Sequence, residues 1–457
     1  MNRRNFLSNT AVMGAGTLGA GSLLTSCGGA KESLTPLRPE AEWNIPKLYE
    51  KGIIPDKAKD GKPLKAGVIG CGGRGSGAAQ NFLDAAPNVS IVALGDVFDD
   101  RLQSCRKALK EKYNADIPDN MCFTGLDNYK KVIDSGVDVV LIATPSAFRP
   151  EQFKYAVNAG KHIFAEKPLG VDPVGIRSIL ADAKKATAQG LCVVTGTLRR
   201  HQRCYIEAYK LVQSGLIGEI VGGNVWYNVN SLWLKMKEKE WTDMEWMLRD
   251  WVNWTWLSGD HIVEQHIHSL DVFNWFTGQK PVKCTGFGAR QRRVTGNQYD
   301  MFSVDYQYEG GFHMHSMCRQ IDGCQRNISE FIQGTKGSWL GNNREGQTIF
   351  DLKGNIIWQF DYEKEKADFQ QTDPFVLELV DWIDHIREGK PINQAEETAI
   401  STMTSIMGRT SAYTGAQVTW DEMMSSDMNL MLDDLSFRNM DMSKFTVAVP
   451  GKAKEVK

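Results

Sequence analysis

Short apolar runs alternate with segments of helical periodicity through the first half of the chain. The apolar runs have the length of buried strands and cover residues 64–70, 89–95, 137–144, 161–165 and 192–196. Segments with apolar side chains at helical spacing lie between them, at residues 76–85, 151–159 and 174–188. Strands that alternate with helices in this way are typical of a parallel sheet with helices on both faces. The pattern therefore predicts a doubly wound α/β domain.

Two amphipathic segments lie near the end of the chain. Residues 372–388 and 395–414 repeat apolar side chains at helical spacing, and we expect packing helices there. Residues 423–457 are rich in Met and Asp and show no clear periodicity. None of these segments indicates a functional site.

The first residues have the features of an export signal rather than of a fold. Arg3 and Arg4 form a twin-arginine pair ahead of a weakly apolar run over residues 11–24, which is too short and glycine-rich to span a bilayer stably. This segment resembles a twin-arginine (Tat) signal. Residues 24–27 resemble a lipobox, in which Cys27 would be acylated after cleavage. The alternative is a plain signal with a chance cysteine.

Composition excludes several classes of protein. The chain has 457 residues, 42% hydrophobic and 24% charged, which suggests two or three globular domains and excludes disordered, collagen-like and polytopic membrane proteins. A net charge of -2 provides no electrostatic attraction for nucleic acid. The nine cysteines have no CxxC or zinc-ligand spacing. A chain that folds before Tat export would keep most of the eight besides Cys27 as buried thiols.

A glycine-rich turn lies between the first predicted strand and the first predicted helix. Residues 70–75 read Gly-Cys-Gly-Gly-Arg-Gly, a G-x-G-x-x-G pattern in the context that dinucleotide binding requires. Gly70 permits the tight turn, Gly72 lets the backbone approach a pyrophosphate, and Gly75 lets helix and strand pack closely. We expect the phosphates at the helix N-terminus, with a cofactor site that includes Gly70, Gly72, Gly73, Arg74 and Gly75.

An acidic residue ends the next predicted strand. Asp96 lies where a carboxylate accepts hydrogen bonds from ribose hydroxyls and repels a 2′-phosphate. This favours NAD over NADP as the cofactor, although the nearby Arg101 would suit NADP. The alternative is a glycine-rich turn in an unrelated α/β domain.

Polar residues also end the later predicted strands. Thr144, Pro145 and Ser146 follow one strand, and Glu166 and Lys167 follow the next. Ligands of doubly wound sheets bind at the carboxyl ends of the strands. We therefore expect these residues to surround one crevice together with the glycine turn.

These motifs together resemble the glucose–fructose oxidoreductase / inositol dehydrogenase (Gfo/Idh/MocA) family. The resemblance covers roughly residues 65–420 and rests on the G-x-G-x-x-G, the strand-end Asp, the Thr-Pro turn and Glu-Lys-Pro at residues 166–168. Residues 214–220 are similar to the start of the family's second domain. The resemblance implies an α+β domain with an open, mostly antiparallel sheet, one face of which forms part of the pocket while the other often oligomerises. Plausible strands of that sheet are residues 221–230, 282–290, 301–308, 311–318 and 327–333.

The resemblance and the N-terminal features divide the chain into four parts. These are a Tat-type signal with lipobox (1–27), a tether and arm (28–64), an NAD-binding Rossmann domain (65–190) and a substrate-binding and oligomerisation domain (191–457).

Catalytic residues follow from the same resemblance. The lysine of Glu-Lys-Pro is catalytic in the family, which implies that role for Lys167. Residues 264–271 are similar to the family's D-x-G-x-H-x-x-D pattern, with His268 as its histidine, Glu264 in place of Asp and His266 in place of Gly. We expect Lys167 to polarise the reacting oxygen and His268 to accept the proton. Glu264 would orient His268 if residues 258–276 form one helix. The alternatives are a surface lysine and a structural histidine.

Substrate contacts are expected from basic and aromatic residues. Arg200 matches a pocket arginine of the family, and Arg149 or Phe148 stands where a histidine often follows the Thr-Pro turn. Eight of the 13 tryptophans lie between positions 226 and 275. Indoles stack on the apolar faces of sugars, so two or three should touch a carbohydrate and the rest should pack. The predicted contacts are Arg200, Arg149, Trp251, Trp254 and His266.

A metal site is the alternative use of the histidine cluster. On a continuous helix His261, Glu264 and His268 would share one face, which would suit a divalent ion. The same set fits a cluster that handles protons, and we expect no resident metal.

The resulting expectation is an exported NAD-dependent oxidoreductase that acts on a secondary hydroxyl or ketone of a sugar or glycoside. Its tightly bound cofactor would be recycled by a second sugar, as in some relatives. One alternative is a glycosidase that uses bound NAD for transient oxidation and elimination. Another is a non-catalytic sugar-binding lipoprotein. We expect a homo-oligomer, no nucleic-acid partner, and membrane attachment only through a lipid at Cys27.

Overall fold

The computed structural model describes residues 54–342 and 346–451, all of which belong to the unit that begins at Glu42. The predicted signal, Cys27 and most of the predicted tether lie outside the described residues. The end of the predicted arm packs on the unit, since Ile54 and Ala58 are buried and Arg203 donates to the Ile54 carbonyl at 2.9 Å. In the described part of the chain, no helix is both long and apolar enough to span a membrane.

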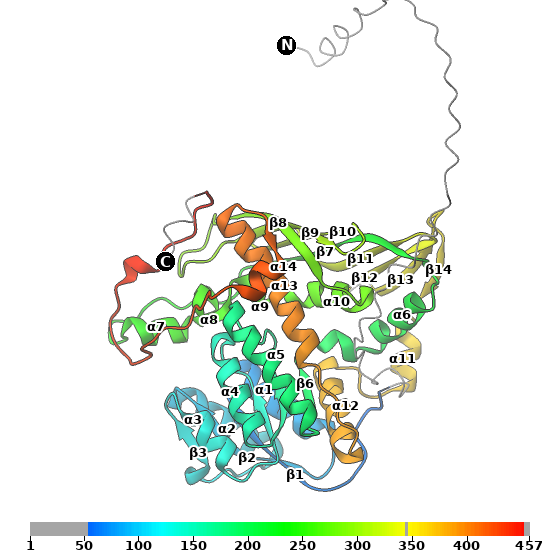
Figure 1. The fold of residues 1–457 in the computed structure, drawn as a ribbon. Coiled ribbons are helices and arrows are strands. Elements are labelled where there is room, and N and C mark those ends of the chain that lie inside the picture. The colour runs from blue at the N-terminus through cyan, green and yellow to red at the C-terminus, as the bar shows by residue number, and fades with distance from the viewer. Residues whose placement is uncertain (1–53, 343–345, 452–457) are drawn as a thin grey trace, which may run out of the picture. The chain divides into compact units, whose positions relative to one another are not determined.

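Six parallel strands form the first sheet, which confirms the predicted doubly wound domain (Figure 1). Their order is β3-β2-β1-β4-β5-β6. They span β1 Leu64–Ile69, β2 Val89–Asp96, β3 Cys122–Thr124, β4 Val139–Ile142, β5 His162–Ala165 and β6 Val193–Thr195. The direction of strand progression reverses between β1 and β4, and folds of this kind bind ligands in the crevice at that point.

Helices cover both faces of this sheet. One face packs against α1 Gly73–Ala85, α2 Asp99–Tyr113 and α12 Pro374–Glu388, and the other against α3 Asn128–Asp134, α4 Arg149–Asn158 and α5 Pro173–Ala188. Helix α12 comes from the far end of the chain and lies beside α1. The nucleotide-binding half therefore includes a late segment, and its last strand β6 lies beyond the expected boundary at residue 190.

Nine strands form the second sheet, in the order β14-β13-β12-β11-β7-β10-β9-β8-β15. Among the described strands of this second sheet, only β7 and β10 pair in parallel. The sheet is therefore mostly antiparallel, as expected. The strands are β7 Ile220–Val229, β8 Pro281–Ala289, β9 Met301–Tyr308, β10 His313–Gln320, β11 Asn327–Gly334, β12 Gly337–Asn342, β13 Gly346–Asp351, β14 Ile356–Gln359 and β15 Val418–Thr419. The sequence pattern predicts the first five of these strands but not the last four.

Helices lie along one face of the second sheet (Figure 1). These are α6 Arg203–Gln213, α10 Ile267–Thr277 and α13 Ala395–Thr414, which pack against its strands. Two short helices, α11 Tyr362–Asp368 and α14 Trp420–Ser425, complete this half. The predicted helices at 372–388 and 395–414 correspond closely to α12 and α13.

The condition that residues 258–276 form one helix, on which the pairing of Glu264 with His268 depended, is not met. The segment instead forms three pieces, α8 Thr255–Ser258, α9 His261–Glu264 and α10. Gly259 and Asp260 have φ angles of 79° and 78°, which end α8 and start α9 in a new direction. The buried Asp260 carboxylate stabilises this break because it accepts hydrogen bonds from the backbone N–H groups of His261 and Tyr299 at 2.6 and 2.9 Å.

A third apolar cluster joins an inserted segment to the end of the chain. The segment consists of α7 Asp243–Arg249 and η5 Trp251–Asn253. Its buried Met244, Met247 and Leu248 pack with Leu430, Met440 and Phe445 of residues 426–451, which we call the C-terminal arm. Most of the region without clear helical or strand periodicity thus forms the C-terminal arm.

We expect Gly75→Ala to lower the free energy of unfolding by about 1–3 kcal/mol, because the new Cβ would lie 1.7 Å from the Gly70 carbonyl oxygen. Gly73→Ala is the matched control, since no heavy atom lies within 4 Å of its added Cβ. Urea unfolding of both variants measures the difference. Equal stability of the two would contradict the close packing of α1 on the turn.

Candidate functional site

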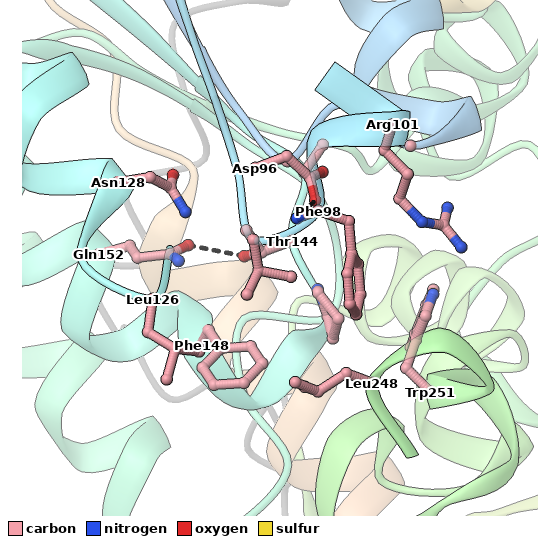
Figure 2. A pocket seen from close by; sticks show the side chains of 15 residues that line it. Asp96, Phe98, Arg101, Leu126, Asn128, Thr144, Phe148, Gln152, Leu248 and Trp251 are labelled. Atoms are coloured by element: carbon pink, nitrogen blue, oxygen red, sulfur yellow. Dashed lines mark hydrogen bonds between the residues drawn. The ribbon is translucent and has the colours of Figure 1, made fainter. Parts of the chain in front are cut away.

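A cleft lies at the carboxyl edge of the parallel sheet (Figure 2). Five predicted cofactor residues line it, namely Gly70, Gly72, Asp96, Thr144 and Pro145. Thr144 donates a hydrogen bond to the Gln152 side chain at 2.6 Å, drawn in Figure 2, which fixes the wall formed by the end of β4. The structure thus brings the glycine turn, the strand-end acid and the Thr-Pro turn together.

The glycine turn is shaped to receive an anion. Gly70 has a φ of 91°, and a Cβ there would lie 2.8 Å from the Ala143 backbone, so this position tolerates only glycine. Helix α1 starts after Gly72 with neither a side-chain cap nor an acidic residue in its first turn. Its first N–H groups and the positive end of its dipole are therefore available to a phosphate. The space beside Gly73 is open, which leaves room for that group.

Asp96 is held at the mouth of this turn by backbone amides. Its carboxylate accepts hydrogen bonds from the N–H groups of Cys71 and Phe98 at 2.7 and 2.9 Å. Burial raises the pKa of Asp96, while these two amides oppose that change. Each carboxylate oxygen keeps a second lone pair, so Asp96 can still accept from a ribose hydroxyl. Arg101 lies on the same wall, and its guanidinium is 3.3 Å from where a Cβ on Gly72 would lie.

Lys167 and Glu264 form a buried ion pair between the two halves of the chain. The Lys167 ammonium donates to a Glu264 carboxylate oxygen at 3.1 Å and to the Glu264 backbone carbonyl. The other Glu264 carboxylate oxygen accepts from the Ser146 hydroxyl at 2.7 Å. Lys167, Glu264 and His268 do not line the cleft themselves, but Ser146 follows Pro145 of the cleft wall and so connects the Lys167–Glu264 pair to that wall.

His268 is half-buried, and its side chain makes no hydrogen bond to any residue in the described part of the chain. Its ring stacks on Tyr227, with centroids 6.3 Å apart and an interplanar angle of 21°. Burial lowers the pKa of His268 well below the usual histidine value, and the charges of Lys167 and Arg199 lower it further. His268 is therefore a neutral imidazole near pH 7, able to accept a hydrogen bond.

Glu264 does not orient His268, contrary to the sequence-based expectation. The helix is interrupted between α9 and α10, so the two side chains do not share a helical face. Both Glu264 oxygens have other partners, Lys167 and Ser146. The ring of Tyr227 packs on His268 instead.

Three predicted substrate contacts face the protein interior instead. Arg149 is buried and donates to the backbone carbonyls of Thr144 and Pro168, each at 2.6 Å, and so clamps the cleft wall from behind. Arg200 forms a bidentate pair with Asp271 at 2.8 and 2.9 Å. His266 is hydrogen-bonded to Ser316 of β10 at 2.7 Å. Their side chains are at most 4% exposed, which removes them from contact with a substrate.

Arg74 and Glu166, both predicted cofactor residues, form an ion pair with each other. Arg74 also donates to Glu378 of α12 at 3.2 Å. Although burial opposes ionisation, Arg74 and Lys167 hold the pKa of Glu166 below its usual value. The pair ties the glycine turn to the Glu-Lys-Pro strand end instead of facing the cleft.

The two predicted substrate tryptophans differ in position. Trp251 lines the cleft opposite Asp96, as Figure 2 shows, so it lies on the nucleotide side of the site. Trp254 is 3% exposed and packs edge-on against Trp246 and Phe445. Trp254 is therefore part of the third apolar cluster and does not contact a ligand.

The histidines of the possible metal site point to different neighbours. His261 contacts Asp260 at 3.0 Å, His266 contacts Ser316, and His268 stacks on Tyr227. Within residues 54–342 and 346–451, no group of three His, Cys, Asp or Glu side chains is arranged to hold a metal ion.

Several cleft residues were missed from the sequence. They are Val97, Phe98, Leu126, Asn128, Ala143, Gln152 and Leu248, whereas Phe148, one of the two residues considered for the histidine position, does line the cleft. Phe98 and Leu126 each lie shortly after the end of a strand, β2 and β3. Their position after a strand could have indicated that they line the cleft. Nothing in the local sequence marks Leu248, because it reaches the cleft only through tertiary packing.

Comparison with known proteins identifies both halves of the chain. A model described as an oxidoreductase family with an NAD-binding Rossmann fold matches residues 64–195, and one described as the GFO/IDH/MocA C-terminal domain matches residues 205–340. The chain is 24% identical to the NAD⁺-dependent scyllo-inositol 2-dehydrogenase of Bacillus subtilis over 78% of its own length and 96% of that protein.

Two further comparisons bear on fold and activity. A crystal structure of scyllo-inositol dehydrogenase from Lactobacillus casei with NAD(H) and scyllo-inositol shares the fold, with a TM-score of 0.59 and 21% identity, covering 78% of this chain and 99% of that one. A glycosyl hydrolase family 109 protein of Bacteroides thetaiotaomicron is 26% identical over 44% of this chain and 40% of its own length.

Acidification should destabilise the protein through its buried histidines. Burial lowers the pKa of His266 well below the unfolded value near 6.5, and the charges of His261 and Arg199 add to this effect. Below pH 6.5, His266 therefore binds a proton in the unfolded chain but stays neutral in the folded protein. The free energy of unfolding then falls by about 1.4 kcal/mol for each pH unit.

From pH 7.5 to pH 5.5, we expect the free energy of unfolding of His266→Gln to fall by about 1.4 kcal/mol less than that of the parent protein. Urea unfolding at the two pH values measures this, with each variant compared with itself at pH 7.5. An identical loss in both proteins would contradict a depressed His266 pKa.

Proposed function

Because the chain is a member of the Gfo/Idh/MocA oxidoreductase family, we propose that it is an exported enzyme that oxidises or reduces a secondary hydroxyl or ketone of a sugar or glycoside. The observation that carries this proposal is the buried Lys167–Glu264 pair beside a cleft built for a dinucleotide. The named inositol dehydrogenases among its relatives support an NAD-dependent dehydrogenase.

The cleft fits NAD on three counts. The uncapped start of α1 and the open side of Gly73 suit the pyrophosphate, Asp96 suits the ribose, and the Thr144-Pro145 wall leads towards Lys167. NAD supplies the acceptor for the hydride when it is bound. The residues of the chain then have to hold the alcohol and take its proton.

Lys167 is placed to bind the reacting oxygen. Two of its three N–H groups are directed to Glu264, so one remains for a substrate hydroxyl. Its positive charge stabilises negative charge that develops on that oxygen as the proton leaves.

His268 is the proposed proton acceptor. It is neutral because burial and neighbouring positive charges lower its pKa, and it has a free ring nitrogen. A neutral imidazole beside Lys167 can accept the hydroxyl proton as the carbon loses its hydride. Tyr227 holds the ring by stacking and is therefore a positioning residue.

A retained cofactor is part of the proposal. An enzyme exported with its nucleotide has little free NAD outside the cytoplasm, so a second sugar would return the cofactor to its starting state. A sugar panel watched at the reduced-nicotinamide absorbance, after mass spectrometry of the purified protein for nucleotide, tests both points.

A glycosidase that acts by transient oxidation and elimination is the second candidate. The similarity to a glycosyl hydrolase family 109 protein favours it, whereas the intact Glu-Lys-Pro at residues 166–168 favours the dehydrogenase. Product analysis separates the two, because the glycosidase releases free sugar and the dehydrogenase forms a keto-sugar. A sugar-binding lipoprotein without catalysis would give neither product.

Self-association is proposed for the face of the second sheet opposite α10 and α13. The strand register places Phe287, Met317 and Trp226 in one row across this face, with Phe331 and Leu340 in the next. Phe287 is 72% exposed. Apolar side chains gathered on a sheet face suit burial against a second copy, and sedimentation of the purified protein measures the oligomer.

We expect Lys167→Met to reduce hydride transfer at least ~10³-fold while nucleotide binding is kept, because the reacting oxygen loses its cationic partner. Lys161→Met is the matched control, since Lys161 begins the same strand region and donates only to the Val137 carbonyl at 2.8 Å. Single-turnover reduction of bound NAD and nucleotide titration provide the two readouts. A Lys167→Met variant that turns over like the parent would refute the assignment.

Export is tested at the N-terminus. Replacement of Arg3 and Arg4 by lysine should leave the protein in the cytoplasm, and Cys27→Ala should give an exported protein without lipid label. Cell fractionation and labelling with a radioactive fatty acid measure these outcomes. Export of the double-lysine variant at the parent level would contradict a Tat signal.

A further inference from the structure

The second half of the chain supplies one wall of the nucleotide cleft. Leu248 at the end of α7 and Trp251 of η5 line the cleft together with Asp96 and Phe98 at the end of β2 (Figure 2). Asp96 marks the ribose end, so these two residues lie against the adenosine half of a bound dinucleotide. The segment of α7 and η5 therefore covers a cofactor whose phosphates are held by the other half.

Arg249 fastens this segment to the nucleotide-binding half. Its guanidinium donates to the Asp100 carboxylate of α2 at 3.1 Å and lies 3.9 Å from the centroid of the Phe98 ring. Glu245, one turn earlier on α7, accepts from the same guanidinium at 3.0 Å. Arg249 thus holds α7 and the cleft-lining Phe98 together, next to Leu248 and Trp251.

The C-terminal arm supports the segment from its other side. Phe437 stacks on Phe98, with ring centroids 5.9 Å apart. Asp243 at the start of α7 accepts from the backbone N–H of Met440 at 2.9 Å, and the Met244 N–H donates to the Arg438 carbonyl at 3.2 Å. The segment is therefore closed over the cleft by contacts on both sides.

We propose that α7 and η5, fastened by Arg249 and the C-terminal arm, form a roof over the adenosine half of NAD that makes release of the cofactor slow. The dinucleotide must then leave by opening of this roof. The inference rests on the proposed function, and it assigns retention of the cofactor to Leu248, Arg249 and Trp251.

The test follows the release of NADH from the full chain. Protein loaded with NADH is mixed with excess NAD, and the loss of bound-NADH fluorescence gives the dissociation rate. We expect Arg249→Ala to release NADH about tenfold faster, from loss of a partly exposed ion pair and a cation–π contact. Trp251→Ala should release it about tenfold faster or more, because an indole wall is removed.

Matched controls separate the roof from general effects of substitution. Arg106→Ala removes another Arg–Asp pair of α2, with Asp119 at 2.6 Å, away from the cleft. Trp358→Ala removes a partly exposed indole of β14. Both should release NADH at the parent rate. Parent-like release from Arg249→Ala and Trp251→Ala would overturn the proposal.

Two further measurements keep the result interpretable. Asp100→Ala breaks the same ion pair from the exposed side of α2, so it should also raise the NADH dissociation rate. The double variant Asp100→Ala/Arg249→Ala should release NADH less than twofold faster than Arg249→Ala alone, because both substitutions remove one interaction. Thermal unfolding without nucleotide identifies a variant that has lost its fold. Because release is measured without sugar, a failed sugar panel would refute the proposed reaction and leave the roof standing.

Discussion

The ion pair between Lys167 and Glu264 is the contact on which the site depends, because it joins the two halves of the chain beside the cleft. Lys167 follows β5 of the parallel sheet, whereas Glu264 ends α9 in the second half. Their side chains are 10% and 7% exposed, and a buried charge without its partner is strongly unfavourable. Each residue therefore fixes the other, and the Ser146 hydroxyl fixes Glu264 against the Thr-Pro turn. The fold places the amine through this pair.

Two buried arginines, Arg199 and Arg200, and the partly exposed Arg74 contribute to the electrostatics around that amine. Arg199 pairs with Glu330, Arg200 with Asp271, and Arg74 with Glu166. A guanidinium keeps its proton and offers five donors, so it is stable inside a protein only with carboxylate or carbonyl partners. Burial is the main cause of the lowered pKa of His268, and the positive charges of Lys167, Arg199 and Arg74 add to it. The paired arginines thus support the neutral state of the proposed proton acceptor.

The short edge strand β3 was missed, but the sequence was sufficient for five of the six parallel strands, because they are continuous apolar runs and the first turn carries glycine in a fixed order. It failed where tertiary partners decide. The helix expected over residues 258–276 is broken because Asp260 adopts a positive φ that its buried hydrogen bonds stabilise. Arg200 was predicted as a pocket residue from the family resemblance, and its buried partner Asp271, 71 positions away, could not be foreseen from the local sequence. Local pattern carries no information about such pairs, and the same holds for Leu248 in the cleft.

The excess of tryptophan between positions 226 and 275 has a structural meaning that differs from a surface for stacking sugars. Trp254 anchors the cluster beneath the segment, whereas Trp251 reaches the nucleotide cleft. Large rigid side chains cover area at a small cost in conformational entropy, which suits a wall that has to stay closed. The C-terminal arm, residues 426–451, supports this wall, so the wall depends on contacts between segments that lie far apart in the sequence.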